Sequence, residues 1–399
     1  MPGYSPQTIY PFAVNALLVG SQIWNIVYGG KYSFTLRIAG TFFAMGIILV
    51  LIPLLAHIGG AAGFWLTFLI LFAFGIFAGI GQSAVFMLAG ALPFEFIGAV
   101  MLGQGIAGIS ANILRALTYI IFPVAKNENN LFIGAFVYFL IGAVYMFICG
   151  ALQFVLKKNE YAVFHLWQNP GFKPKWQDLS PLIASKSSES SPISPRLSRK
   201  AKPPTTGETI KSVIGTLKEN LRDTQGLIYS ITFIFLITLL LFPGTTADTY
   251  FKWINNMHLA NSEGWYQLAC VFLFNIFDTV GRYCGGKPAL DLSIRKVNWG
   301  TISRVLFIAT FLLTDFECAP QWLWNTDWFK ILNLFLFAFT NGYLSTLCAI
   351  KSPGTVKESR RAIVGGYIGM FISLGCLLGS LLQTGMGPIL ALTPKQKNS

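Results

Sequence analysis

The chain has 399 residues, of which 54% are hydrophobic and only 11% are charged. This composition excludes an ordinary soluble globular protein, in which about 25% of residues are charged, and predicts an all-α polytopic membrane protein. The formal net charge of +13 does not indicate nucleic-acid binding, because the basic residues gather in the connections between apolar segments, as in loops that face anionic lipid. The six cysteines show neither metal-ligand spacing nor a disulfide framework, so we expect no metal and no cofactor.

Ten apolar segments are long enough to cross the roughly 30 Å hydrocarbon core of a bilayer. They lie at residues 10–28, 36–57, 64–91, 98–123, 131–156, 227–243, 264–284, 299–314, 329–350 and 363–390. If the first connection is inside the cell and the sides then alternate, the inside connections carry most of the 29 Lys and Arg residues, as the positive-inside rule requires. This orientation places both termini outside, so we expect one further helix upstream of Met1.

The first five spans form a predicted amino-terminal half, residues 1–156. Its third span carries Gln82, whose amide needs partners near mid-membrane and is able to bond either another helix or a ring such as a purine. From this residue alone, an interhelical hydrogen bond is favoured. The fourth span carries Gly103, Gln104 and Gly108. A Gly-x-Gly inside an apolar helix with no preceding strand predicts helix packing or gating and not a nucleotide loop.

The connection at residues 157–224 is basic and rich in Ser and Pro. Such a composition buries too little apolar surface to fold, so we predict a disordered cytoplasmic linker. It ends in an amphipathic segment that we expect to lie on the inner leaflet. Ser191 and Ser194 each precede a proline near basic residues and are candidate sites for a protein kinase, although Ser-rich linkers also occur without such regulation.

The carboxy-terminal half, residues 225–399, has five spans, and its seventh span overall carries Asn275, Asp278 and Arg282. A charge within lipid costs several kcal/mol, with ~3 kcal/mol at the low end. The spacing of four puts Asp278 and Arg282 on one helix face, where they can pair. Charged residues in spans usually face the interior of the bundle or a polar path, so these residues predict a polar substrate site, with a purely structural ion pair as the alternative.

Three further polar or small residues lie in the later spans. Arg304, about one turn inside the eighth span, is expected either to extend toward the membrane surface or to pair with an acid at an inner gate. Asn341 and Gly342 lie in the middle of the ninth span. A polar group beside a glycine is typical of helix packing or gating.

Several motifs taken together resemble the equilibrative nucleoside transporter family. They are QSAVFMLAGALP at 82–93, GQGIAG at 103–108, Phe242-Pro243, NIFDTVGR at 275–282, Ser303-Arg304 and FAFTNGYLSTLC at 337–348. They occur in family order over both halves, with the long connection in the expected place. The resemblance implies a two-half bundle like the major facilitator fold, with eleven helices against ten in this chain, that moves nucleosides or nucleobases by alternating access.

Carried over residue by residue, the resemblance implies that Asp278 and Arg282 bind ribose hydroxyls, that Gln82 bonds the base, and that Asn275 supports the site. The family's first helix, with a Pro-Trp-Asn signature, has no counterpart here, which agrees with the upstream helix expected from charge. We therefore predict a facilitative carrier, not an enzyme, in the plasma membrane by default. The alternatives are a proton-coupled carrier in which Asp278 titrates, and a truncated family member that does not transport.

Overall fold

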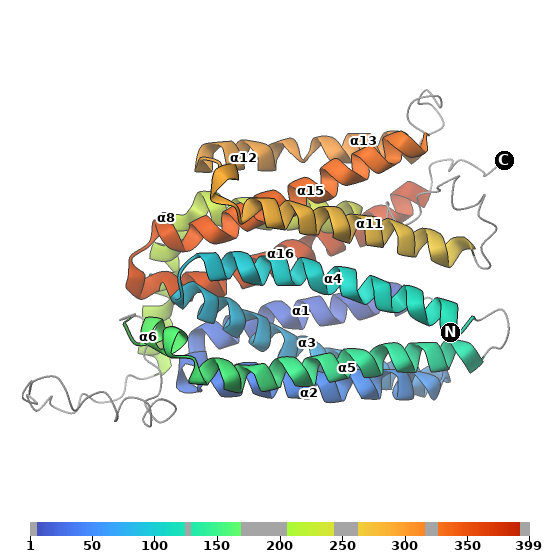
Figure 1. Ribbon diagram of the computed structural model, residues 1–399, viewed down its shortest axis with the longest axis horizontal. Coiled ribbons are helices and arrows are strands. Elements are labelled where there is room, and N and C mark those ends of the chain that lie inside the picture. The colour runs from blue at the N-terminus through green and yellow to red at the C-terminus, as the bar shows by residue number, and fades with distance from the viewer. Residues whose placement is uncertain (1–5, 124–128, 169–205, 243–261, 316–325, 392–399) are drawn as a thin grey trace, which may run out of the picture.

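The computed structural model describes residues 6–123, 129–168, 206–242, 262–315 and 326–391, and within these residues the chain forms helices and no strand. The long helices lie side by side, parallel or antiparallel, in one elongated bundle (Figure 1). Helices are the expected solution in lipid, because no water is present there to satisfy backbone N–H and C=O groups outside a helix.

The two predicted halves can be followed along the chain. The amino-terminal half contains α1 (Pro6–Tyr28), the short 3-10 helix η1 (Gly29–Lys31), α2 (Phe34–His57), α3 (Gly60–Ala91), α4 (Glu95–Ile121) and α5 (Asn129–Lys158), followed by α6 (Glu160–Gln168). The carboxy-terminal half contains α8 (Thr206–Leu241), α11 (Ser262–Gly285), η4 (Pro288–Leu290), α12 (Ile294–Ser303), α13 (Leu306–Asp315), α15 (Asp327–Lys351), η5 (Ser352–Thr355) and α16 (Glu358–Ala391).

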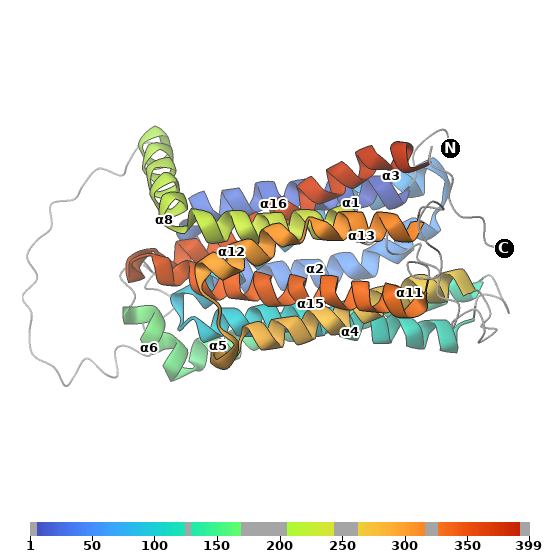
Figure 2. The same ribbon diagram turned by 90° about the horizontal axis from the view of Figure 1, so that it is seen from above.

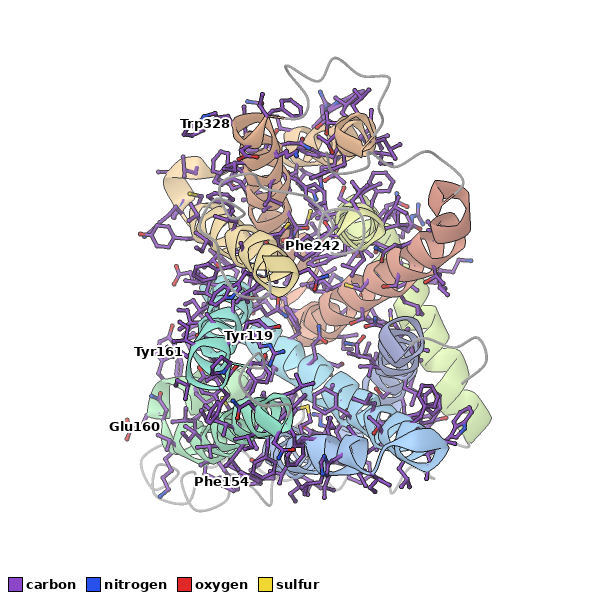
Figure 3. The ribbon with its side chains drawn as sticks, turned by 90° about the vertical axis from the view of Figure 1, so that its right-hand side faces the viewer. Tyr119, Phe154, Glu160, Tyr161, Phe242 and Trp328 are labelled. Carbon is purple, nitrogen blue, oxygen red and sulfur yellow. The ribbon has the colours of Figure 1, made fainter. Side chains whose placement is uncertain are left out.

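Seen along the bundle, the helices of each half gather together, one half above the other (Figure 3). The halves meet where α3 and α1 lie against α16, and where α4 lies against α11 and α15. Large apolar side chains cover the outer rim, where Trp328 and Phe154 point away from the bundle (Figure 3) and Trp328 is 84% exposed. An apolar exterior of this extent fits contact with lipid.

Within the part of the chain that the structure describes, eight helical segments have the length and hydropathy to cross a membrane: Phe34–His57, Gly60–Ala91, Glu95–Ile121, Asn129–Lys158, Lys218–Leu241, Ile294–Thr314, Asp327–Thr355 and Arg360–Gly385. The remaining predicted spans correspond to α1 and α11, which lie alongside the others in both views (Figures 1 and 2). Polar residues such as Asn275, Asp278 and Arg282 lower the hydropathy of α11. The all-α membrane architecture is confirmed, whereas the count of ten spans stays a prediction.

The structure corrects three boundaries. Residues 157–168, predicted as the start of a disordered linker, belong instead to the end of α5 and to α6. The amphipathic segment and the sixth span form one helix, α8, of 36 residues, whose first part bends away from the bundle (Figure 2). The eighth span is interrupted between α12 and α13, at Arg304 and Val305. Ser191 and Ser194 lie outside the described residues.

Candidate substrate site

A glycine brings α15 against α11 at the level of the predicted site. A Cβ atom added to Gly342 would overlap the Asp278 carbonyl and would lie 2.8 Å from the Arg282 amide nitrogen. Only glycine permits this backbone approach, which small residues commonly provide between membrane helices. The neighbouring residue, Asn341, is thereby placed beside the Asp278 side chain.

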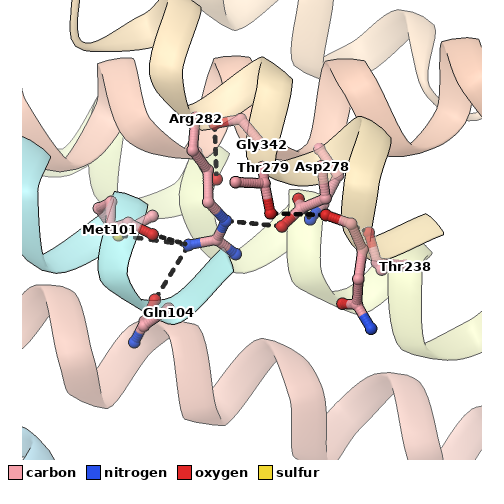
Figure 4. A network of polar contacts seen from close by, with 10 residues as sticks. Met101, Gln104, Thr238, Asp278, Thr279, Arg282 and Gly342 are labelled. Carbon is pink, nitrogen blue, oxygen red and sulfur yellow. Dashed lines mark hydrogen bonds and ion pairs between the residues drawn. The ribbon is translucent and has the colours of Figure 1, made fainter. Parts of the chain in front are cut away.

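The ion pair that the spacing predicts is present and buried. Arg282 Nε lies 2.6 Å from Asp278 Oδ2, and the two side chains are only 7% and 4% exposed (Figure 4). The other carboxylate oxygen, Oδ1, accepts a hydrogen bond of 2.7 Å from Asn341 Nδ2. Each oxygen of Asp278 therefore has a donor, as a buried carboxylate requires.

The guanidinium of Arg282 also reaches the other half of the protein. Its Nη1 donates to the Met101 carbonyl oxygen at 3.0 Å and to Gln104 Oε1 at 3.0 Å, both on α4 (Figure 4). One buried side chain thus bonds an acid within its own helix and two acceptors across the interface between the halves.

The polar contacts continue from Asn341 into α8 and to Arg304. The Thr238 hydroxyl lies 2.7 Å from Asn341 Oδ1, and Arg304 Nη2 donates to that hydroxyl at 2.9 Å. Arg304 Nη1 donates to the Phe337 carbonyl at 2.9 Å and to the Thr340 hydroxyl. These contacts bind α8, α11 and α15 to the break between α12 and α13.

The expectation that Arg304 extends toward the membrane surface is wrong, because its side chain is fully buried, with 0% exposure. Among the described residues its hydrogen-bond partners are Phe337, Thr340 and Thr238, and it forms no direct ion pair with an acid there. The helix break explains the burial, since α12 ends at Ser303 and Arg304 occupies the turn, from which the side chain enters the core of the carboxy-terminal half over the Phe337 ring at 4.8 Å.

Comparison with known proteins identifies the family. A model of the family described as nucleoside transporter matches residues 68–384, most of the chain. The chain belongs to the nucleoside transporter family. Equilibrative nucleoside transporter 1 of Mus musculus is 26% identical over 368 residues, which cover 88% of this chain and 76% of the mouse protein. Equilibrative nucleotide transporter 1 of Arabidopsis thaliana is 24% identical over 356 residues, covering 88% and 70% of the two chains.

Solved structures confirm the predicted fold of this nucleoside transporter family member. A structure of the Escherichia coli fucose:proton symporter FucP has a TM-score of 0.51 and 13% sequence identity, and the match covers 96% of this chain and 83% of that one. Another FucP structure, described as a Major Facilitator Superfamily transporter, has a TM-score of 0.50 over 96% and 82% of the chains. At this identity the likeness concerns the fold alone.

The structure brings Asn275 close to the ion pair but not Gln82. Asn275 lies one turn before Asp278, and a Cβ added to Gly108 of α4 would lie 2.6 Å from Asn275 Oδ1. Gln82 is half-buried on α3, one turn from Phe86, which contacts α16. Within the described part of this nucleoside transporter family member, Gln82 makes no hydrogen bond to Asp278 or Arg282.

The glycines of α4 differ in their surroundings. Gly108 packs against Asn275, and Gly105 packs against Thr279, whose Oγ1 would lie 2.5 Å from an added Cβ. Gly103 is exposed and no described atom lies within 4 Å of a Cβ placed on it. The packing contact expected at Gly103 is therefore made by Gly105, because Gly105 and Gly108, and not Gly103, lie on the face of α4 that meets α11.

A cavity of about 610 Å³ opens between the halves at the predicted cytoplasmic end. Residues of α4, α11, η4, α15 and η5 line it, and among its charged lining residues are Glu95, Arg282, Lys287, Asp291 and Lys351. Lys351 Nζ lies 2.6 Å from Asp291 Oδ1 at its edge. Arg282 thus belongs both to the buried pair and to the wall of a space that opens toward the predicted cytoplasmic side.

Two participants in the site were not predicted from the sequence. Thr238 lies in the apolar run ITFIFLITLLLF of α8, and Met101 takes part through its backbone carbonyl. Thr238 is a weak signal, because a hydroxyl in a membrane helix usually bonds its own helix backbone. A main-chain acceptor carries no signal in the amino-acid sequence at all.

Proposed function

We propose that the protein is a facilitative transporter of nucleosides that works by alternating access, and that Asp278 and Arg282 hold the ribose. The observation that carries this proposal is the buried pair, because it lies where the halves meet and Arg282 bonds both of them. Membership of the nucleoside transporter family supports the class of substrate. A carrier of this kind is not an enzyme, and we place it in the plasma membrane.

The chemistry of the pair suits a sugar. A carboxylate accepts hydrogen bonds from hydroxyl groups and a guanidinium donates to their oxygens, so Asp278 and Arg282 together match the donors and acceptors of a ribose. Hydrogen bonds to charged groups are stronger than neutral ones, about 1.5–3 kcal/mol each. Such a gain offsets the expense of keeping charges within the membrane.

Substrate binding would also act on the interface. A ribose oxygen that accepts from the Arg282 guanidinium competes with the Met101 carbonyl and Gln104, which hold α11 to α4. A ligand shifts a conformational equilibrium by the difference in its affinity for the two states. We infer that the nucleoside loosens the α4 contact and lowers the barrier to rocking of one half against the other.

Gln82 is the proposed partner of the base. Its side chain is half-buried and has no hydrogen-bond partner among the described residues, which leaves its amide free to offer a donor and an acceptor. Phe86, one turn away on α3, contacts Gly369 of α16. Gln82 therefore belongs to the face of α3 that is directed toward the other half.

The test is uptake into proteoliposomes that contain the purified protein. We expect radiolabelled uridine or adenosine to enter until the internal and external concentrations are equal, and unlabelled nucleoside inside to accelerate entry. Protein-free liposomes are the control. Absence of uptake for every nucleoside and nucleobase tested would overturn the proposal, and accumulation above equilibrium in an imposed pH gradient would establish the proton-coupled alternative.

Asp278→Asn tests the site itself. The amide removes the charge that pairs with Arg282 and replaces an acceptor by a donor, so we expect uridine uptake to fall at least about tenfold at equal protein in the membrane. Asp223→Asn is the matched control, because Asp223 forms an exposed ion pair with Arg360 on the predicted cytoplasmic side. Unchanged uptake by Asp278→Asn would show that the buried pair is structural.

A further inference from the structure

We infer that Arg304 is a positioning residue for the ribose site, acting on the Asp278 carboxylate through Thr238 and Asn341. This inference rests on the proposed function above. Arg304 has no exposed surface, so it does not touch the substrate. Its effect must pass through a chain of hydrogen bonds whose direction is fixed by the chemistry of each member.

The first link is the Arg304 guanidinium, which is held at one end. Its Nη1 donates to the Phe337 carbonyl at 2.9 Å and to the Thr340 hydroxyl, both on α15. This anchorage leaves Nη2 directed at Thr238 Oγ1, 2.9 Å away. An arginine has five N–H donors and no acceptor, so the Thr238 oxygen is the acceptor in this contact.

The second link is the single proton of the Thr238 hydroxyl. Since the oxygen accepts from Arg304, its proton is available for an acceptor, and two lie at 2.7 Å: Asn341 Oδ1 and the Ile234 carbonyl of the same helix. The Ile234 carbonyl already accepts within the helix, whereas Asn341 Oδ1 has no other partner among the described contacts. A buried amide oxygen without a donor costs about 1–3 kcal/mol, so the bond to Asn341 is favoured.

The third link is the orientation of the Asn341 amide. An ionised carboxylate has no proton to donate, so the NH₂ group of Asn341 must face Asp278 Oδ1, at 2.7 Å, and its oxygen must face Thr238. Turning the amide over would place two acceptors, Asn341 Oδ1 and Asp278 Oδ1, against each other, and would direct the NH₂ group at a Thr238 oxygen that already accepts from Arg304. Arg304 and Thr238 therefore hold Asn341 in the orientation that presents its NH₂ group to Asp278.

The consequence is a carboxylate fixed at both oxygens, by Asn341 at Oδ1 and by Arg282 at Oδ2. A fixed carboxylate offers its remaining lone pairs to the ribose hydroxyls in one geometry, which is how positioning shells sharpen recognition. Loss of the Thr238 hydroxyl should therefore weaken the binding of ribonucleosides selectively. A ligand that lacks the 2′ and 3′ hydroxyls does not make these hydrogen bonds, so its affinity should not fall.

The experiment measures dissociation constants by thermal-shift titration of the purified full chain, with uridine and 2′,3′-dideoxyuridine as probes. Thr238→Val keeps the shape of the side chain and removes the hydroxyl. We expect uridine to bind about tenfold more weakly and dideoxyuridine to change less than twofold, with affinity restored in Thr238→Ser. Thr310→Val is the matched control, because the Thr310 hydroxyl bonds Asn333 Oδ1 at 2.9 Å between α13 and α15, away from Asp278.

Asp278→Asn separates failure of this inference from failure of the proposed function. If Asp278→Asn leaves the preference for uridine over dideoxyuridine unchanged, Asp278 does not bind the ribose and the proposed function of the site falls. If Asp278→Asn removes the preference and Thr238→Val does not, the inference about Arg304 falls. If Arg304 and Thr238 act through Asp278, Thr238→Val should also have no added effect on uridine affinity in the Asp278→Asn variant. An equal effect in the native protein and in Asp278→Asn would overturn the inference.

Discussion

Arg282 places one guanidinium group between three acceptors that belong to two helices. Nε bonds Asp278 on α11, while Nη1 bonds the Met101 carbonyl and Gln104 on α4. The planar fork of arginine suits such divergent partners, and a lysine ammonium does not, because it is a compact point charge on a flexible stem. This position therefore requires the planar geometry of a guanidinium as well as its positive charge.

Arg282→Lys should accordingly keep the positive charge but lose function. We expect the uridine KM to rise by about tenfold, the loss of about 1.4 kcal/mol, because one ammonium cannot satisfy Asp278 and α4 together. Uptake in proteoliposomes measures this, with protein content verified by blotting. Arg361→Lys is the control, since Arg361 pairs with Glu358 at an exposed position. Full activity in Arg282→Lys would argue for a role of charge only.

At the scale of elements, the site depends on how closely α15 approaches α11. Gly342 and Gly281 face each other's helices, where a Cβ on either would overlap a backbone carbonyl of the partner helix. The approach sets the Asn341 amide beside Asp278. α15 also carries Phe337 and Thr340, which hold Arg304, so the register of α15 against α11 links the geometry at Asp278 to that at Arg304.

Gly342→Ala should separate these helices. We expect the free energy of unfolding to fall by about 1–3 kcal/mol, as for overpacked interiors, together with uridine affinity. Gly103→Ala makes the same change at a position with open space, and alanine has the higher helix propensity, so its stability should not fall. Thermal unfolding in detergent compares the two variants, and equal melting temperatures would refute the close approach.

Local features of the sequence predicted part of this arrangement. A spacing of four was enough to predict the Asp278–Arg282 pair, because it depends on one helix. The bond between Thr238 and Asn341 joins residues 103 positions apart, and the choice between Gly103 and Gly105 depends on which helix face meets α11. Neither follows from one sequence, because rotation and register are set by packing. The break at Arg304 also lacks a nearby proline that would have marked it.

At the scale of the whole molecule, the halves are joined along two lines. On one side α4 lies against α11, from Gly105 and Thr279 to the ring contact between Tyr119 and Trp265. On the other side α3 and α1 lie against α16, near the predicted cytoplasmic end. In alternating access the two ends of the bundle open in turn. At least one of these contacts between the halves must therefore break during the cycle.

The contact between α3 and α16 is one that we expect to break during the cycle, because full opening toward the cytoplasm separates the halves at the end where this contact lies. A Cβ on Gly366 of α16 would lie 2.9 Å from Met87 Cγ on α3. Because Cγ is one bond beyond Cβ, the two Cβ atoms would lie no farther apart than the range of about 3.5–4.5 Å that a disulfide needs. In the variant with Met87→Cys and Gly366→Cys, oxidation should therefore cross-link the halves and stop uridine uptake, and a reductant should restore it. The single variants under the same oxidant control for the native thiols, five of which are free in the described residues. Uptake that persists when mass spectrometry shows a complete cross-link would mean that α3 and α16 move as one body.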